Sequence, residues 1–397
     1  MSAFIYLERF FGENFITRVI CTIFALLGLA IWLIAPKKAS VFLGFFTGIL
    51  WFWWIGLSFL YTEYPFLAPI VSVFVSAVYA LIFWAISYFN LWIRAILIAA
   101  IFYFVEPFGF NWFKPEIILS SGFFSPHFFA FPFTIFSLFL AIFSVRFLRK
   151  KRIFFALNFC AIIFLTAAFI LPAPIAPKLP EIAIALANTK VTQDVKWLPK
   201  ELPRQIDESL EIVDRAIEAR DDLVILPEAA FPMFLNKDEI VIAELSRRGE
   251  YLTIVAGGLH LKGRLPYNSA YIFQNGEFLI ADKVFLVPFG EASPLPKWAG
   301  RWINSLFFNG AEDYLTAAKA TDFAIGEHNF RIAICYEIGV EKMFQDAPPY
   351  IIAISNNGWF APSIEPALQR LLARHYARRY GKIIYHASNE SPSEIIR

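Results

Sequence analysis

The chain has 397 residues with a formal net charge of +2; 58% of the residues are hydrophobic and only 17% are charged. Soluble proteins carry about 25% charged residues, so this composition excludes a protein that is soluble along its whole length. Its three cysteines exclude a disulfide scaffold, and no basic face interleaved with aromatic residues points to nucleic acid.

Long apolar runs are concentrated in residues 1–172, which we predict to be a helical membrane domain. A helix needs about 20 apolar residues to cross the hydrocarbon core of a bilayer. The segment 107–127 is interrupted by Pro and Gly and is predicted to be an interfacial or re-entrant loop. The sequence predicts about six spans, at residues 17–35, 40–61, 66–89, 91–106, 128–146 and 153–171.

Basic residues in the connections predict the orientation of these spans, because Lys and Arg are enriched in cytoplasmic loops. Lys37 and Lys38 follow the first span, and Arg94 lies near the junction of the third and fourth. The connection between the last two spans carries Arg146, Arg149, Lys150, Lys151 and Arg152. With these connections in the cytoplasm, the N-terminus and the chain after residue 172 both lie on the outer side.

The N-terminal segment is not expected to be a cleavable signal peptide. Glu8, Arg9 and Glu13 precede the first long apolar run, whereas a signal begins with a basic region followed directly by an apolar one. The segment 3–15 is a candidate for a further, short membrane element. After the last span, residues 173–180 are predicted to be a Pro-rich, extended linker.

Residues 181–397 have the pattern of a soluble α/β domain, with short apolar runs alternating with helical periodicity. Asn275-Gly276 is a strong hairpin signal within 268–285. The helix at 365–381 carries Arg374, Arg378 and Arg379, which we expect on a solvated basic face. The other predicted elements are strands at 181–189, 223–228, 252–260, 349–356 and 382–390, helices at 202–222 and 239–251, and a hairpin at 322–337. This alternation predicts a layered α/β fold.

Several reactive side chains follow predicted strands. Glu228 and Cys335 each end a strand, and Lys283 lies just after the second strand of a hairpin. A thiol acts as a nucleophile when a base takes its proton, and a buried carboxylate can serve as that base. A Lys can stabilise the oxyanion of a tetrahedral intermediate. The remaining cysteines, Cys21 and Cys160, lie within apolar runs and are expected to be unreactive.

Five segments carry a specific resemblance: LVILPEAAFP (223–232), YNSAYIF (267–273), DKVFLVPFGEASP (282–294), ICYE (334–337) and ISNNGWF (354–360). Their order resembles that of the nitrilase superfamily, and with the preceding membrane half the chain resembles bacterial apolipoprotein N-acyltransferases. The resemblance implies a multi-span α-helical membrane domain followed by a nitrilase-like αββα sandwich.

The resemblance also implies roles for individual residues. Glu228 would be the general base, Lys283 the electrostatic stabiliser and Cys335 the nucleophile. Four further residues match supporting positions of the family: Glu291, Tyr336, Glu337 and Trp197.

By the same resemblance, an acyl chain moves from a phospholipid, expected to be phosphatidylethanolamine, to Cys335 as a thioester. The acceptor is the α-amino group of a diacylglyceryl-cysteine at a lipoprotein N-terminus. We expect a monomer in the bacterial inner membrane, with the catalytic domain on the periplasmic side and no metal or other cofactor. Family members continue beyond the position that corresponds to Arg397, so the catalytic domain over 181–397 is expected to be truncated at its C-terminal end.

Two alternatives remain open from the sequence. A membrane-anchored amidase or hydrolase of the same superfamily would use water in place of the amine acceptor. A non-enzymatic membrane protein with a degenerate domain would not need Glu228, Lys283 and Cys335 together. The six predicted spans favour lipid chemistry, because an amidase that acts on small solutes gains nothing from them.

Overall fold

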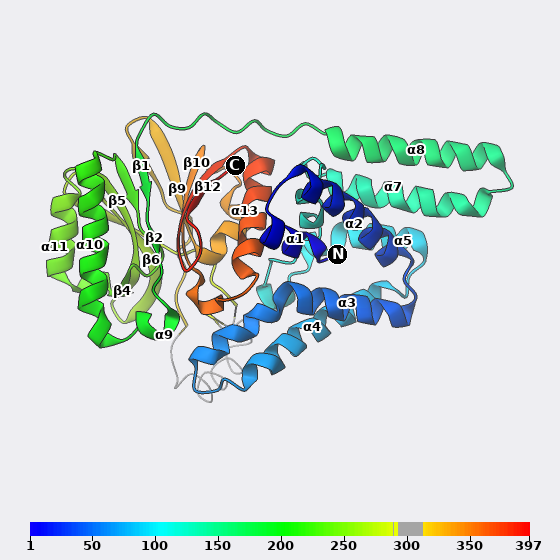
Figure 1. The fold of residues 1–397 in the computed structure, drawn as a ribbon. Coiled ribbons are helices and arrows are strands. Elements are labelled where there is room, and N and C mark those ends of the chain that lie inside the picture. Colours follow the sequence, from blue (N-terminus) through cyan, green and yellow to red (C-terminus); the bar gives the residue numbers. More distant parts are fainter. Residues whose placement is uncertain (289, 293–312) are drawn as a thin grey trace. The chain divides into compact units, whose positions relative to one another are not determined.

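The computed structural model describes residues 1–288, 290–292 and 313–397, which form two compact units (Figure 1). Unit 1 comprises Met1–Leu60, Pro65–Pro174 and Ser363–Arg379, and unit 2 comprises Tyr61–Tyr64, Ile175–Pro362 and Tyr380–Arg397. This division differs from the predicted domains in that 363–379 is grouped with the apolar helices. Phe289, Ser293 and Pro294 of the segment 282–294 lie outside the described residues.

Five helices of unit 1 are long and apolar enough to cross a membrane, among the residues described. The fourth predicted run forms α5 (Leu91–Phe104), whose 14 residues extend about 21 Å and fall short of a hydrocarbon core of about 30 Å. The prediction of about six spans included this run, which is the shortest of the six. The five are α2 (Phe15–Ile34), α3 with its 3-10 extension (Lys37–Tyr61), α4 (Leu67–Ile86), α7 with its extension (Ala130–Phe147) and α8 (Lys151–Ile170).

Arg94 joins the connections at one end of the helices of unit 1. Its guanidinium donates to the carbonyl oxygens of Leu33 at 2.9 Å, Ala35 at 2.8 Å and Ser87 at 2.6 Å. The ammonium of Lys37 lies 3.6 Å from the centroid of the Tyr88 ring. The α2–α3 and α4–α5 connections therefore lie together, and in Figure 1 the α7–α8 turn lies towards the same side of this unit.

Other contacts define the opposite end of unit 1. The Arg18 guanidinium, near the start of α2, donates to the Gly122 carbonyl oxygen at 3.1 Å. The Ser125 hydroxyl donates to the Leu171 carbonyl oxygen, just after α8, at 2.8 Å. The beginning of the chain, the segment 107–127 and the end of α8 therefore lie at one end, away from Arg94.

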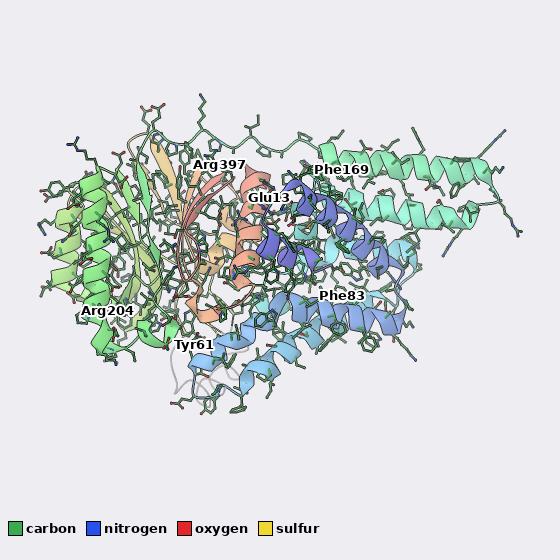
Figure 2. The ribbon with its side chains drawn as sticks, in the orientation of Figure 1. Glu13, Tyr61, Phe83, Phe169, Arg204 and Arg397 are labelled. Atoms are coloured by element: carbon green, nitrogen blue, oxygen red, sulfur yellow. The ribbon has the colours of Figure 1, made fainter. Side chains whose placement is uncertain are left out.

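Residues 112–119, in the middle of the segment 107–127, are buried within unit 1, where they fill space between the helices. Phe113 is 2% exposed, and its ring centroid lies 4.5 Å from Phe102, 4.7 Å from Tyr79 and 4.8 Å from Trp51. Non-helical backbone at membrane depth is tolerated where protein surrounds it, because lipid cannot satisfy its polar groups. Stacking of Phe83 on Trp32, with ring centroids 4.2 Å apart, continues this aromatic core (Phe83 is labelled in Figure 2).

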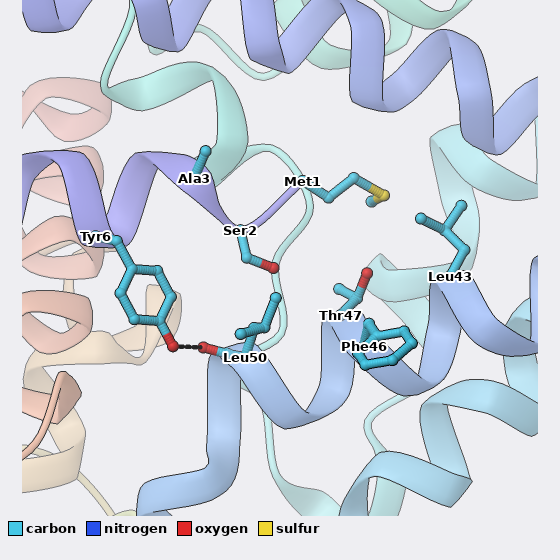
Figure 3. Close-up of a pocket in the computed structure, with 8 residues that line it drawn as sticks. All are labelled: Met1, Ser2, Ala3, Tyr6, Leu43, Phe46, Thr47 and Leu50. Atoms are coloured by element: carbon cyan, nitrogen blue, oxygen red, sulfur yellow. Dashed lines mark hydrogen bonds between the residues drawn. The ribbon is translucent and has the colours of Figure 1, made fainter.

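The first helix, α1 (Ala3–Phe11), borders an apolar cavity of about 420 Å³ beside α3 (Lys37–Phe52) (Figure 3). One hydrogen bond crosses between these helices, from the Tyr6 hydroxyl to the Leu50 carbonyl oxygen at 2.9 Å. The cavity is lined by Met1, Ser2, Ala3, Tyr6, Leu43, Phe46, Thr47 and Leu50.

Helix α13 (Glu365–Tyr380) does not carry the solvated basic face that its sequence predicts. Arg374 is 3% exposed and forms ion pairs with Glu8 and with Glu13, the latter at 2.6 Å (Glu13 is labelled in Figure 2). Arg379 is 7% exposed and pairs with Glu116 at 3.0 Å. The prediction is wrong for these two arginines because acids from distant parts of unit 1 cover them.

Unit 2 contains two six-stranded sheets. The first has the order β1 (Ile184–Leu186), β3 (Leu223–Ile225), β5 (Thr253–Lys262), β6 (Leu265–Gln274) and β7 (Glu277–Asp282), with β4 (Phe231–Phe234) paired to β5. The second has the order β12 (Glu394–Ile396), β11 (Ile383–Asn389), β10 (Tyr350–Asn356), β9 (His328–Ile334) and β8 (Asp322–Ile325), with β2 (Asn188–Thr189) paired to β11.

Two apolar cores hold the layers of unit 2 together. One lies between the sheets and joins side chains such as Ile225 and Val255 to Ile334 and Ile352. The other packs α10 (Leu202–Ala219) and α11 (Glu239–Arg248) onto the first sheet. Figure 1 shows both helices beside this sheet, so unit 2 contains one helical layer and the two sheets of the predicted αββα sandwich.

Candidate active site

Strand directions bring the predicted reactive residues to one edge of each sheet. In the first sheet β3 and β5 are parallel, and two antiparallel steps through β6 make β7 run the same way. Glu228 follows β3 by three residues and Lys283 follows β7 directly. In the second sheet β9 and β10 are parallel, so Cys335 and Asn356 share an edge. Ligand sites in α/β sheets form at such carboxyl ends.

The backbone is unusual beside both the acid and the thiol. Cys335 has φ of 53° and Ala229, the neighbour of Glu228, has φ of 49°. Few non-glycine residues adopt this left-handed region, and such residues cluster at functional sites. A Cβ atom on Gly257 would lie 2.5 Å from the Glu228 Cα atom, so β5 needs glycine where the Glu228 loop crosses it.

Glu228 lies close to both other residues of the expected triad. The Glu228 carboxylate accepts a hydrogen bond from the Cys335 thiol. It also accepts from Asn268 Nδ2 at 2.8 Å and from the Asn356 backbone N–H at 2.7 Å. The Lys283 Nζ atom lies 4.0 Å from Glu228 Oε1. A carboxylate, a thiol and an ammonium therefore meet in one small, buried site.

Glu291 is the closest ionic partner of Lys283. Its Oε2 atom lies 2.7 Å from Lys283 Nζ, and its Oε1 atom accepts from Asn268 Nδ2 at 2.6 Å. The Val287 backbone N–H donates to the same carboxylate at 2.8 Å. Asn268 thus bridges Glu228 and Glu291; the sequence marked it as part of YNSAYIF without assigning it a role.

Glu337 binds backbone rather than the thiol. Its carboxylate accepts from the N–H groups of Val284 at 2.6 Å, Phe285 at 2.9 Å and Ile334 at 2.7 Å. Two of these donors directly follow Lys283 and one directly precedes Cys335. The Glu337 carboxylate therefore holds the backbone beside both Lys283 and Cys335.

Burial and neighbouring charges set the protonation of the site. Burial raises the pKa of Glu228, and the Lys283 ammonium opposes this rise. Burial alone would lower the pKa of Lys283, but Glu291, Cys335 and Glu228 together raise it, so Lys283 is a cation. Burial also raises the pKa of Glu337 to about 7. A carboxylate with a raised pKa can take a proton from a thiol near neutral pH, as general-base catalysis requires.

The remaining expected residues differ in their placement. Tyr336 is 4% exposed, whereas Trp197 is 39% exposed and, within the described residues, makes no hydrogen bond to the triad. Tyr314 was not expected in the site. The Tyr314 backbone N–H donates to the Glu291 carbonyl oxygen at 2.9 Å, and burial, with the charges of Glu291 and Glu228, raises the pKa of Tyr314 to about 12.

Sequence relatives cover nearly the whole chain. The chain is 36% identical over 397 residues to an apolipoprotein N-acyltransferase of Wolinella succinogenes, covering 100% of this chain and 93% of the relative. The chain belongs to the apolipoprotein N-acyltransferase family. A Helicobacter pylori member is 34% identical, with 98% and 91% coverage. A profile described as "Apolipoprotein N-acyltransferase integral membrane domain" matches residues 1–168.

Solved structures similar to this apolipoprotein N-acyltransferase family member cover about half of it. A CN-hydrolase superfamily protein from Xanthomonas campestris matches with a TM-score of 0.41 and 15% identity, covering 54% of this chain and 77% of that protein. A nitrilase-superfamily member from Saccharomyces cerevisiae matches with a TM-score of 0.40 and 18% identity, covering 55% and 82%.

Proposed function

We propose that this chain transfers an acyl chain from a membrane phospholipid to the α-amino group of an apolipoprotein, through a thioester on Cys335. One observation carries the proposal: in a member of this family, the Glu228 carboxylate is hydrogen-bonded to the Cys335 thiol and lies 4.0 Å from the Lys283 ammonium. The donor is a glycerophospholipid such as phosphatidylethanolamine, and the acceptor is an N-terminal diacylglyceryl-cysteine.

The first half-reaction forms the acyl-enzyme. Glu228 takes the thiol proton, and the Cys335 sulfur attacks the sn-1 ester carbonyl of the phospholipid. The Lys283 ammonium stabilises the oxyanion of the tetrahedral intermediate, which a preorganised buried cation does without reorganisation of solvent. As the carbon–oxygen bond breaks, the proton on Glu228 passes to the departing oxygen. The products are an acyl thioester and a lysophospholipid.

The second half-reaction uses the same groups to move the acyl chain from the Cys335 sulfur to the acceptor nitrogen. The neutral amine of the acceptor attacks the thioester carbonyl, and Glu228 takes a proton from the attacking nitrogen. The carbon–sulfur bond breaks and the Cys335 sulfur recovers a proton from Glu228. The amide product leaves the site in its starting state, so the scheme needs no other cofactor.

The apolar helices support a location at the bilayer. The end of unit 1 marked by Arg94 and Lys37 fits the cytoplasmic side by the distribution of basic residues, as expected for the bacterial inner membrane. The opposite end, which includes Arg18 and the end of α8, would then face the periplasm. Labelling of single introduced cysteines with a membrane-impermeant maleimide in intact spheroplasts tests this orientation.

The test of the acyl-enzyme is intact-protein mass spectrometry after incubation with phosphatidylethanolamine in detergent. We expect a mass gain of one acyl chain that hydroxylamine removes and that is absent from Cys335→Ala. Cys21→Ala and Cys160→Ala should keep the adduct. Adding a diacylglyceryl-cysteine peptide should move the acyl chain to the peptide. Release of free fatty acid in its place would indicate a hydrolase, and an adduct that persists in Cys335→Ala would refute the nucleophile.

A further inference from the structure

The turn between α7 and α8 concentrates positive charge at one end of unit 1. Figure 1 shows this turn at the tip of the α7–α8 pair, beyond the other helices of unit 1. Five of its residues are basic and exposed, and they are called the basic turn below: Arg146, Arg149, Lys150, Lys151 and Arg152. No Asp or Glu occurs in the chain between Glu116 and Glu181. The basic turn therefore has no acid near it in sequence.

The charges of the basic turn have no ionic partner within the part of the chain that the structure describes. None of the five side chains makes an ion pair or a hydrogen bond there, and the Arg146 guanidinium lies 5.3 Å from the centroid of the Phe143 ring. Arg94 and Lys37, at the same end of unit 1, are engaged: Arg94 binds carbonyl oxygens, and Lys37 lies over the Tyr88 ring. Unlike these two, the basic turn does not join parts of the protein.

The beginning of α8 makes the uncompensated charge more costly. Its N-cap residue is Lys150, which makes no side-chain cap hydrogen bond, and its first turn contains no acid. The N-terminal end of a helix carries partial positive charge, so Lys151 and Arg152 lie where cations are unfavourable. An anion bound to the basic turn would relieve this repulsion.

Exposed apolar side chains beside these cations indicate which kind of anion fits. Val145 is 56% exposed, Leu148 is 57% exposed, and Phe155 on the first turns of α8 is 66% exposed. The protein buries only 11% of the apolar window of α8, so this helix faces lipid along most of its length. A soluble anion would leave these side chains in water. A phospholipid covers them with its acyl chains while its phosphate meets the cations.

We propose that the basic turn binds the headgroups of anionic phospholipids in the leaflet that borders this end of unit 1. A phospholipid with net negative charge, such as phosphatidylglycerol, matches the unpaired cations. Phosphatidylcholine carries its own cation beside the phosphate and matches them less well. Clusters of about four to eight Lys or Arg directly beside a spanning helix attract anionic lipids in this way. None of the five residues belongs to the candidate active site, so the inference goes beyond the proposed acyl transfer.

The test measures lipid binding by the full chain in a non-ionic detergent, where no leaflet exists and orientation in a membrane has no influence. Native mass spectrometry compares bound phosphatidylglycerol with bound phosphatidylcholine. The parent protein should prefer phosphatidylglycerol, and added salt should weaken that preference because it screens exposed charges. The test variant is Arg146→Gln, Arg149→Gln, Lys150→Gln, Lys151→Gln and Arg152→Gln. It should bind phosphatidylglycerol no better than phosphatidylcholine.

A double variant covers the case in which five substitutions impair folding. Each Lys or Arg near a lipid surface strengthens binding about fivefold, so Arg149→Gln with Lys150→Gln should bind phosphatidylglycerol about 25-fold more weakly than the parent. The melting temperature in detergent should stay at the parent value, because these side chains are exposed and do not join parts of the protein. A matched control removes five exposed basic residues of unit 2 and should bind like the parent: Lys200→Gln, Arg215→Gln, Lys237→Gln, Lys262→Gln and Arg264→Gln.

Three results would overturn the proposal. Equal binding of phosphatidylglycerol by the parent and the folded variants would show that the basic turn is not the site. An equal loss in the unit 2 control would show that net charge alone explains the binding. Competition by glycerol 1-phosphate as strong as that by phosphatidylglycerol would show that the anion is recognised without its acyl chains, and the ligand would then not be a lipid.

Discussion

Arg374 and Glu8, which are 366 positions apart in the chain, form an ion pair in which both side chains are 4% exposed. Arg374 also binds Glu13 at 2.6 Å. Helix α13 follows the end of β10 by only a few residues, yet its buried charges are matched by acids that precede the first long apolar helix. The stability of unit 1 therefore depends on residues from both ends of the sequence.

Arg374→Met should destabilise the protein strongly, because it leaves the buried Glu8 carboxylate with the more distant Arg370, at 3.9 Å, in place of its close partner. Breaking a buried pair in this way costs about 3–5 kcal/mol. The measurement is thermal unfolding in detergent. Arg215→Met is the matched control: Arg215 is 66% exposed and 3.8 Å from Glu211, and such surface pairs contribute less than about 1 kcal/mol. Similar small losses in both variants would contradict the burial of the Arg374 pair.

Gly257→Ala should reduce acylation of Cys335 with a smaller effect on folding. The added Cβ would lie 2.5 Å from Glu228 Cα and 2.6 Å from the Ala229 nitrogen, so the loop that carries the base must move. A displacement of about 1 Å at a reacting group can slow catalysis about 100-fold. Single-turnover acylation measures this rate.

Gly258→Ala is the control for this change on the neighbouring residue. Its Cβ would meet the Leu235 side chain at 3.2 Å, away from the backbone of Glu228. We expect acylation close to that of the parent protein. Equal rates in Gly257→Ala and Gly258→Ala would show that the close approach at Gly257 does not position the acid.

Acyl-enzyme formation should decline as pH falls through the pKa of Glu228, because the base must be ionised to take the thiol proton. Burial raises this pKa above its ordinary value of 4.5, so the acidic limb of the pH–rate profile should lie above pH 4.5. Asn268→Leu removes a hydrogen bond to the ionised carboxylate, which raises the pKa further and moves the limb to higher pH.

Asn236→Leu provides the control for the pH profile. Asn236 bonds to the backbone of Leu261 at 3.0 Å and touches none of the triad residues in the described structure, so its loss should affect stability and leave the limb unchanged. A limb at or below pH 4.5 in the parent protein, or a limb that Asn268→Leu leaves in place, would argue against Glu228 as the base.

Local patterns in the sequence were sufficient for most of the secondary structure. The Asn275-Gly276 hairpin is confirmed, with φ of 53° and 78°, because a tight turn between strands requires residues that tolerate positive φ. Apolar periodicity located β3, β9 and β10. Asn356 ends β10, Cys335 directly follows β9, and Glu228 follows β3 by three residues. Parallel strands then bring these residues together, which the order of strands along the chain could only suggest.

Partners of charged groups were decided by the tertiary structure alone. Residue type showed that Arg374 and Glu337 are ionisable, but periodicity encodes which face is buried and not what lies against it. The structure pairs Arg374 with Glu8 and directs the Glu337 carboxylate at three backbone N–H groups. The sequence by itself determined the membrane helices, the α/β pattern and the reactive residues; folding determined their electrostatics, because burial and distance set the energy of a charge.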